Sequence, residues 1–410
     1  MVLPFACPLT FGQGLQAGAA KRVVTPDPLL PVSGGIGPGK ATTEKRGDLW
    51  VRAMVLEKNG IRIAIVGSDF LGFPAVLGNK VRARVKGIPP QNILISATHT
   101  HSAPDCYGFP DAQGNAGSDL AYLDLVCARM AEAINEANRL LKPARLRIGT
   151  GEAAGKIAYN YYAEELYDPR CGVIQVLGEG EAAIATLVNY AIHPEVLGPG
   201  QGITSADVIG PLYDRIEKRA GGIAVFVNSA LGGMVTADCR GKDGKDVQTW
   251  DECKRIGNLL ADEALRIVNA AAVQESPALR CHSKTASFPV ESSMMRAIIE
   301  RSPLGFQLAD DGTISTQMNL IELGDARIAT IPGEALPNIG YYLKRKMGAK
   351  HNLLFGLTND AFGYIISEID WGSFKRYRYI TRTSLGERTG TILIDEVLGL
   401  VKSAAAAAAK

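Results

Sequence analysis

An apolar run opens onto two histidines in the stretch Ile93-Leu94-Ile95-Ser96-Ala97-Thr98-His99-Thr100-His101-Ser102-Ala103-Pro104. Its β-branched residues predict a buried strand whose last residues emerge at the edge of a sheet. Side chains of an extended segment alternate between faces, so the spacing predicts that His99 and His101 point to the same side. Pro104 is expected to end the strand, because proline has no N–H group for the ladder.

A His-x-His pair at a strand end has two interpretations. It is either a structural, hydrogen-bonded pair or part of a site that binds a metal or transfers protons. Neutral imidazole is the commonest protein ligand for metals and titrates near neutral pH. The chain has only five histidines, and two of them lie here. We therefore favour a metal or acid–base site.

The composition is that of a soluble globular protein. Hydrophobic residues make up 46% of the 410 residues and charged residues 21%, which is outside the range of disordered chains. Lys and Arg number 44 and Asp and Glu number 42, so no overall field attracts nucleic acid or an anionic membrane. No apolar run approaches the ~20 residues of a spanning helix. The composition leaves the oligomeric state open, with a homo-oligomer as one option.

The cysteines and the N-terminal residues bear on localisation. Seven cysteines are scattered without a Cys-x-x-Cys pair, at positions 7, 106, 127, 171, 239, 253 and 281. This pattern argues against a zinc ribbon or a disulfide framework and favours a reducing compartment. Met1 to Thr10 show no signal peptide. We expect a cytoplasmic protein, with a secreted or periplasmic one as the alternative if a signal has been removed.

Hydrophobic periodicity predicts an α/β fold with mixed β-sheets flanked by helices. The Gly- and Pro-rich residues 14–50 are expected to hold little regular structure. In helix 118–141 the apolar positions, including Leu125, are predicted to be core. Strands are expected at 49–57, 61–70, 91–98, 145–150, 173–177, 182–192, 223–227, 279–288, 316–323, 326–331 and 353–357. Helices are expected at 78–86, 118–141, 211–220, 251–271 and 336–347.

Polar side chains follow several of these strands directly. They are His99 and His101 after strand 91–98, His193 after 182–192, Glu334 after 326–331, and Tyr364 after 353–357. α/β proteins build their sites at strand ends. Gly232 and Gly233 follow strand 223–227, where small residues suit either the close approach of a ligand or tight packing.

Four of these segments resemble motifs of the neutral, or non-lysosomal, ceramidases. Residues 96–104 are similar to the signature SATHTHSGPG of that family. The similarity continues at 189–193 (Asn-Tyr-Ala-Ile-His), at 331–334 (Ile-Pro-Gly-Glu) and from Asn359 through 363–365 (Gly-Tyr-Ile), in the family's order. The resemblance implies the family's catalytic domain, and we expect it to be a single domain over residues 1–403. Residues 404–410 would form a low-complexity tail.

The resemblance also implies a single Zn²⁺ ion held by His99, His193, Glu334 and Tyr364. His101 would lie beside the metal and act in catalysis. Imidazole, carboxylate and phenol ligands suit zinc and leave room for a water. Asp207 and Glu195 are weaker candidates for a base or for a supporting role.

The chain also departs from the family. The segment 232–237 (Gly-Gly-Met-Val-Thr-Ala) lacks the family's serine, and Asn160-Tyr161-Tyr162 stands where the family has Asn-Arg-Ser. Pro194-Glu195 replaces Gly-Thr, and the family's C-terminal β-domain has no counterpart in these residues. Ceramide itself is therefore not the expected substrate. The candidate substrate-binding residues are Tyr161, Asn160, Gly232, Gly233, Thr236 and Tyr377.

The first hypothesis is a zinc-dependent hydrolase that uses a metal-activated water on an amide, ester or lactone bond of a small or lipid-like substrate. A second is an amidohydrolase-type metal barrel, which also begins with His-x-His. It would need further metal-binding histidines, and neither His282 nor His351 is well placed in the sequence. A third is a catalytically silent protein that binds a metal or ligand on a ceramidase-like scaffold.

Overall fold

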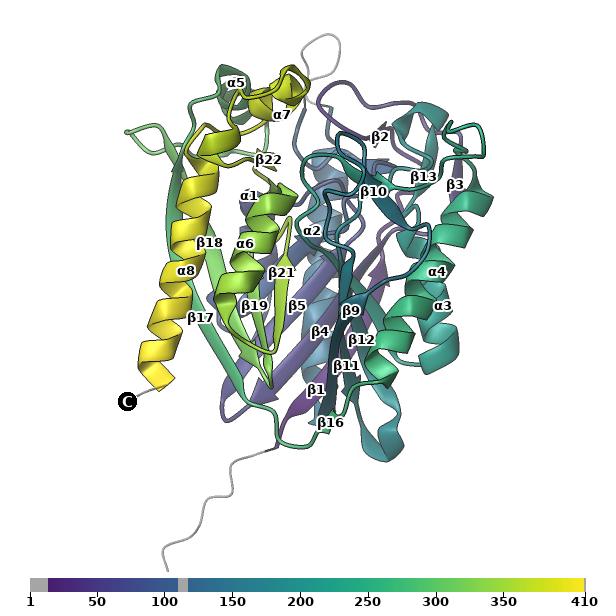
Figure 1. The fold of residues 1–410 in the computed structure, drawn as a ribbon, viewed down its shortest axis with the longest axis vertical. Coiled ribbons are helices and arrows are strands. Elements are labelled where there is room, and N and C mark those ends of the chain that lie inside the picture. The colour runs from purple at the N-terminus through teal and green to yellow at the C-terminus, as the bar shows by residue number, and fades with distance from the viewer. Residues whose placement is uncertain (1–13, 110–116, 409–410) are drawn as a thin grey trace, which may run out of the picture.

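A computed structural model of the chain describes residues 14–109 and 117–408 (Figure 1). Within these residues the strands build three large sheets, flanked by helices. The predicted class, α/β with mixed sheets, is confirmed. Met1 to Thr10, on which the expectation about a signal peptide rests, and Cys7 lie outside the described residues. The other six cysteines form no disulfide with one another.

The first sheet has the order β6-β5-β4-β1-β8, and the second has the order β14-β12-β11-β9-β16. The first consists of β1 (Gln16–Val23), β4 (Trp50–Lys58), β5 (Ile61–Ser68), β6 (Ile93–Ala97) and β8 (Lys142–Pro143). The second consists of β9 (Arg145–Glu152), β11 (Arg170–Leu177), β12 (Ala183–Tyr190), β14 (Ile223–Asn228) and β16 (Val273–Gln274).

The third sheet has the order β17-β18-β19-β21, and four small two-stranded sheets complete the described strands. The third sheet consists of β17 (Leu279–Pro289), β18 (Thr313–Leu323), β19 (Ala326–Thr330) and β21 (His351–Phe355). The small sheets pair β2 (Val32–Ser33) with β7 (Ala103–Pro104), β3 (Glu44–Arg46) with β13 (Ile203–Ser205), β10 (Ala158–Asn160) with β15 (Val235–Ala237), and β20 (Glu334–Ala335) with β22 (Tyr364–Ile365). Short strands such as β2, β10, β13 and β22 gather at the upper end of the molecule in Figure 1.

Each large sheet contains one parallel pair of strands among antiparallel neighbours. The parallel pairs are β5 with β6, β12 with β14, and β19 with β21. Ligands of α/β proteins bind beyond the carboxyl ends of parallel strands. The chain that leaves β6, β12, β19 and β21 carries the residues that we predicted for the site.

Helices cover the outer face of each sheet. α1 (Ala75–Arg82) and α2 (Leu120–Arg139) pack with the first sheet, α3 (Ile209–Ala220) and α4 (Trp250–Asn269) with the second, and α6 (Pro337–Met347) and α8 (Thr389–Ala408) with the third. Figure 1 shows α6 and α8 at the left and α3 and α4 at the right. None of the described helices combines the length and the hydropathy needed to cross a bilayer.

Polar caps explain where the two long helices begin. The side chain of Asp119 accepts a hydrogen bond from the backbone N–H of Tyr122 at the start of α2. Thr249 does the same for Glu252 at the start of α4. Each cap satisfies an N–H group that has no partner inside the helix.

The inner faces of the three sheets meet in one shared hydrophobic core. Met54 and Leu56 enter it from the first sheet, Leu187 from the second, and Leu353 and Phe355 from the third, all fully buried. This shared core fixes the three sheets relative to one another, because dense packing leaves little room for sliding.

Strand β1 corrects the expectation that residues 14–50 hold little regular structure. It lies inside the first sheet, paired with β4 and β8. Helix α2 covers it so closely that a Cβ atom on Gly18 would lie 2.1 Å from the carbonyl oxygen of Ala137. The middle of the strand, residues 17–20, therefore consists of alanine and glycine, and it lacks the apolar periodicity that reveals a strand.

Three helices were not predicted: α5 (Ser293–Arg301), α7 (Arg378–Arg382) and α8. The alanine run near the C-terminus continues α8 to Ala408, and the side chain of Ala404 is buried. Leu125 was expected in the core but is 51% exposed, because it falls on the outer face of α2.

Replacing Phe355 tests the shared core. We expect Phe355→Ala to lower the free energy of unfolding by about 3–5 kcal/mol, because it removes a fully buried ring and leaves a cavity. Phe374→Ala is the control: this ring is 55% exposed, and its loss should change stability by less than about 0.5 kcal/mol. Urea denaturation measures both, and similar effects in the two variants would contradict a common core.

Candidate metal centre

Three imidazoles from two sheets meet at one point. His99 and His101 follow β6, and His193 follows β12. One ring nitrogen from each lies within 4.8 Å of the others. The ring centroids of His99 lie 4.8 Å from those of His101 and 4.6 Å from those of His193. His99 and His193 are buried, and 13% of the His101 side chain is exposed.

The expected extended geometry of the His-x-His pair was wrong, although both rings do lie on the same side. β6 ends at Ala97, and His99 has a φ of 70° in the left-handed region. The pair is therefore not extended, and strand alternation is not what turns both rings to the same side. A left-handed conformation at a non-glycine residue is costly and marks a position held by its surroundings.

Backbone carbonyls orient two of the rings. Nδ1 of His99 lies 2.6 Å from the carbonyl oxygen of Leu71, and Nδ1 of His193 lies 2.8 Å from that of Val235. A carbonyl only accepts, so both rings carry their proton on Nδ1, and the lone pair on Nε2 faces the cluster. Metal-binding histidines in proteins are commonly fixed in this way.

Glu334 supplies a carboxylate to the same point. Its Oε2 atom lies 3.5 Å from Nε2 of His99 and 3.3 Å from Nε2 of His193. The backbone of β20 is held by Gly232, whose N–H donates to the carbonyl of Ala335 at 2.9 Å. A Cβ atom on Gly232 would lie 2.1 Å from the carbonyl oxygen of Glu334. This close approach explains the glycine at position 232.

The electrostatics favour ligands in their metal-binding forms. Burial lowers the pKa of His99 and of His101 to about 3, so both are neutral at neutral pH. Burial alone would raise the pKa of Glu334, but His99 and His193 outweigh it and lower the pKa, which keeps the carboxylate charged. His193 is the exception: burial opposes its protonation, yet the nearby carboxylate of Glu334 raises the pKa of the ring and favours its charged form. Neutral imidazoles and a carboxylate are the forms that bind a metal.

Several buried atoms of the cluster have no hydrogen-bond partner among the described residues. They are Nε2 of His101, Nε2 of His193 and Oε2 of Glu334. A buried polar atom without a partner is costly, and such atoms often mark a bound ion. Three imidazoles and a carboxylate are also a ligand set that suits zinc. The group formed by His99, His101 and His193 could therefore hold a metal ion.

Tyr364 lies next to Glu334 through strand pairing. β22 pairs with β20 so that Tyr364 stands opposite Glu334. Burial raises the pKa of Tyr364 well above its usual value, so the phenol stays protonated. Its hydroxyl donates to the sulfur of Met234 at 3.2 Å, a partner that the sequence did not suggest.

Asn228, at the end of β14, ties the two histidine segments together. Its side-chain N–H₂ group donates to the carbonyl of Thr98 at 3.0 Å and to that of Ile192 at 2.7 Å. Its Oδ1 atom accepts from the N–H of Ile192 at 3.1 Å. Thr98 and Ile192 directly precede His99 and His193, so this one amide sets the spacing of the two imidazoles.

An apolar cavity opens beside the cluster. It reaches His99, His101, Glu334 and Tyr364. Its other walls include Leu71, Tyr107, Phe109, Met295 and Ile298. Met295 and Ile298 belong to α5, which was not predicted, so this wall of the cavity was not expected from the sequence. The cavity suits an apolar group such as an acyl chain.

The two acidic candidates, Glu195 and Asp207, have different surroundings. Oε2 of Glu195 lies 3.5 Å from Nδ1 of His101, where it can act on that ring. Asp207 instead accepts from the N–H groups of Val196, Leu197 and Val208 at 2.8–3.2 Å. Burial raises the pKa of Asp207 to about 6. These bonds favour the supporting role among the two that we expected for Asp207, since its carboxylate holds the loop after His193.

The residues predicted to bind the substrate also have different surroundings. Asn160 is buried, accepts from the N–H of Tyr162 and donates to the carbonyl of Leu166, so its amide builds a turn and is not free for a substrate. Tyr161 and Thr236 border a second cavity, which also reaches Glu195. Gly233 has a left-handed φ of 71° and packs on Leu336, and Tyr377 packs on Tyr162.

The two remaining histidines lie elsewhere. His282, on β17, stands 3.6 Å from Glu322, and Nδ1 of His351 lies 2.9 Å from the hydroxyl of Thr150. The described strands form separate sheets and not one closed barrel. The amidohydrolase-type barrel is therefore wrong.

Comparison with known proteins supports the resemblance seen in the motifs. No family model matches the chain. Neutral ceramidase B of Dictyostelium discoideum is 23% identical over 274 residues, a match that covers 53% of this chain. The chain spans only 38% of the length of that relative.

Solved structures give the fold. The neutral ceramidase from Pseudomonas aeruginosa matches with a TM-score of 0.74 and 17% identity, over 95% of this chain and 75% of the other. A structure described as ceramidase complexed with C2 has the same TM-score and identity and covers 96% of this chain and 75% of its own. The chain therefore has the fold of the neutral ceramidases, and the predicted resemblance is confirmed.

Asn228→Ala tests the link between the histidine segments. We expect a loss of about 3 kcal/mol in the free energy of unfolding, because three buried hydrogen bonds disappear, and metal binding weaker by roughly 10–100-fold. Asn269→Ala, an exposed change at the end of α4, is the control. Urea denaturation and titration with Zn²⁺ measure the two effects. Unchanged zinc affinity in Asn228→Ala would show that the amide does not set the spacing.

Proposed function

We propose that this chain is a metal-dependent hydrolase that cleaves an amide bond, with ester and lactone bonds as related targets, in a small or lipid-like substrate. The observation that carries the proposal is the convergence of His99, His101, His193 and Glu334. Several of their buried atoms lack a hydrogen-bond partner within the described part of the chain. The similarity to neutral ceramidases in fold and in part of the sequence supports it. We further propose that residues 1–403 act as one catalytic domain, because the three sheets share a core.

Zn²⁺ is the metal that we propose, with His99, His193, Glu334 and Tyr364 as its ligands. Tyr364 is the weakest member of this set, because its hydroxyl donates to Met234. When bound, zinc polarises a carbonyl group and lowers the pKa of water toward about 7.

The proton transfers are assigned to His101. Glu195, 3.5 Å from Nδ1, favours the form of the ring with its proton on that atom. Nε2 then has a free lone pair and no partner among the described residues. It can take a proton from the attacking water and return it to the leaving nitrogen.

The apolar cavity indicates the acyl part of the substrate. Its walls, among them Leu71, Phe109 and Ile298, would bury an alkyl chain next to the histidines. We propose an amide other than ceramide, because the segments that carry a serine and an arginine in the ceramidases have Val235 and Tyr161 here.

A catalytically silent binding protein is the second candidate. The absence of the family's serine and arginine favours it, since both belong to the site that the resemblance implies. Retention of His99, His193 and Glu334 in a connected, buried arrangement favours the enzyme. Zinc analysis together with a panel of amide, ester and lactone substrates separates the two.

We expect His99→Ala and His193→Ala to lose both bound zinc and turnover, because each removes a ring whose Nε2 faces Glu334. His282→Ala, on the outer part of β17, should keep both and serves as the control. The measurements are zinc content by mass spectrometry and hydrolysis of N-dodecanoylethanolamine. Stoichiometric zinc in both site variants would exclude the proposed centre.

His101→Ala separates a proton-transfer role from a ligand role. If His101 transfers protons, the variant should keep stoichiometric zinc while turnover falls by roughly 10²–10⁴-fold. Loss of zinc from this variant would instead make His101 a ligand, as its nearness to His99 and His193 also allows. Zinc content and turnover must be measured on the same preparation.

A further inference from the structure

A second cavity borders the histidine cluster, since Thr236 in its wall forms a backbone bridge with His193. Its walls include Tyr159, Tyr161, Glu195, Thr236, Asp246 and Gln248. Two contacts mark the boundary between the cavities. Glu195, in the second cavity, faces His101 in the first at 3.5 Å, and Met234, in the second, accepts from Tyr364 in the first at 3.2 Å.

The two cavities differ in chemistry. The apolar cavity is walled largely by aliphatic and aromatic side chains. The second combines apolar side chains such as Val196 and Met234 with two carboxylates, two phenols, a hydroxyl and an amide. Among the described residues, no Lys or Arg forms an ion pair with Glu195 or with Asp246. Both carboxylates therefore leave negative charge in the second cavity.

Arg240, which stacks on a wall of the cavity, is already neutralised. The guanidinium of Arg240 stacks on the ring of Tyr159 at 3.7 Å, but it binds both oxygens of Asp238 at 2.9 Å and contacts Glu164 at 3.1 Å. Its charge is thus matched by these two carboxylates, and the carboxylates of the cavity keep their own.

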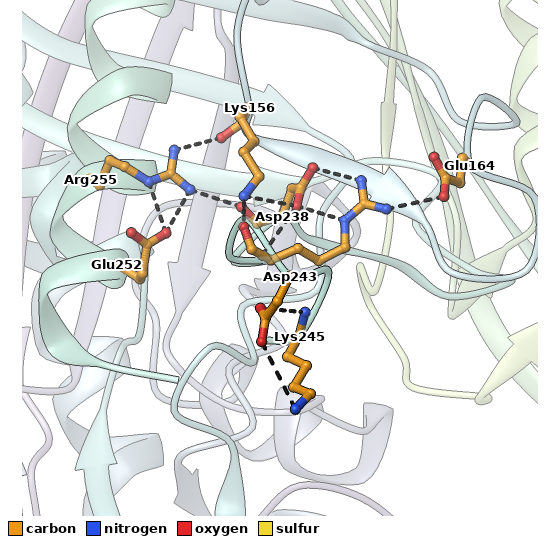
Figure 2. Close-up of polar contacts among 8 residues, drawn as sticks. Lys156, Glu164, Asp238, Asp243, Lys245, Glu252 and Arg255 are labelled. Carbon is orange, nitrogen blue, oxygen red and sulfur yellow. Dashed lines mark hydrogen bonds and ion pairs between the residues drawn. The ribbon is translucent and has the colours of Figure 1, made fainter. Parts of the chain in front are cut away.

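A network of polar contacts holds the loop that carries Asp246 and Gln248 (Figure 2). Arg255, on α4, donates to the backbone carbonyls of Lys156 and Asp238 at 2.8 Å each. The loop closes on itself where the N–H of Val247 donates to the carbonyl of Cys239 at 2.9 Å. Asp246 is exposed, and its backbone is held in the loop by a bridge to Arg240.

We propose that the second cavity receives the amine released by hydrolysis, and that this amine is small, polar and positively charged. The inference rests on the proposed function. Water adds its hydroxyl to the acyl carbon, the C–N bond breaks, and the nitrogen takes the proton, giving a carboxylic acid and an amine. The acyl chain occupies the apolar cavity. A second cationic group on the amine lies between Glu195 and Asp246.

A long apolar amine would fit this cavity poorly. Its chain would displace water from two carboxylates and several hydroxyl groups without replacing their hydrogen bonds, which costs free energy. A compact ammonium group would instead gain attraction from both carboxylates.

Three dodecanoyl amides that differ only in the leaving amine test the inference. They are the amides of ethylenediamine, which is cationic, of ethanolamine, which is neutral, and of glycine, which is anionic. We expect kcat/KM to fall in that order, by roughly tenfold between the first and the last. The dissociation constants of the three amides for the His101→Ala variant, measured by calorimetry, should rise in that order, because the cationic amide is expected to bind most tightly.

Asp246→Asn is the decisive variant. It should lower kcat/KM for the ethylenediamine amide by roughly three- to tenfold, mainly through KM, and lower kcat/KM for the neutral ethanolamine amide less. Asp243→Asn is the matched control, because Asp243 lies in the same loop and, among the residues that the structure describes, forms an ion pair with Lys245 alone. The amide keeps an oxygen for the N–H of Lys245.

The outcomes separate the inference from the proposed function. Hydrolysis of all three amides at equal rates, or a preference for the glycine amide, would overturn the inference and leave the hydrolase. An unchanged preference in Asp246→Asn would also overturn it. If no amide is hydrolysed the proposed function fails, and the order of the dissociation constants still decides whether the cavity selects a cation.

Discussion

The amide of Asn228 holds together parts of the chain that would otherwise be unrelated. Its side chain joins Thr98, which follows the first sheet, to Ile192, which follows the second. Its backbone carbonyl accepts from the N–H of Gly356 at 2.9 Å, directly after β21 of the third sheet. One buried residue thus contacts the exits of all three sheets. The distance between His99 and His193 follows from these bonds, and the shared core keeps the bonds in place.

The end of the molecule that carries the histidines also holds strained backbone. His99, Asp207 and Met234 have φ values of 70°, 52° and 68°, although none is glycine. Such residues cost of order 1–3 kcal/mol each and persist only where the surroundings over-determine them. Here each has a clear anchor: Leu71 binds the ring of His99, backbone N–H groups bind Asp207, and Tyr364 binds Met234. Each of these left-handed residues lies where its segment turns toward the histidine cluster.

The sequence indicated the α/β class and the residues that converge, because apolar runs ending in histidine, glutamate and tyrosine are local features. What it did not indicate depends on distant contacts. β1 was not predicted, because the small residues that fit beneath α2 give no apolar pattern. The conformation of His99 is imposed by neighbours such as Leu71. The side-chain amide of Asn160 and the carboxylate of Asp207 are hydrogen-bonded to backbone groups. The spacing of residues in the sequence does not reveal such contacts. The wall formed by α5 and the polar cavity beyond Glu195 are likewise products of tertiary packing.

The parallel pair in each sheet has a consequence for protein engineering. The cluster draws its side chains from the exits of β6, β12 and β19, and each of these strands belongs to a different sheet. No continuous peptide, hairpin or helix of this chain contains a working subset of them. Grafting the cluster onto another scaffold would require copying the angles between three sheets, so the centre is a property of the whole architecture and cannot be moved as a module.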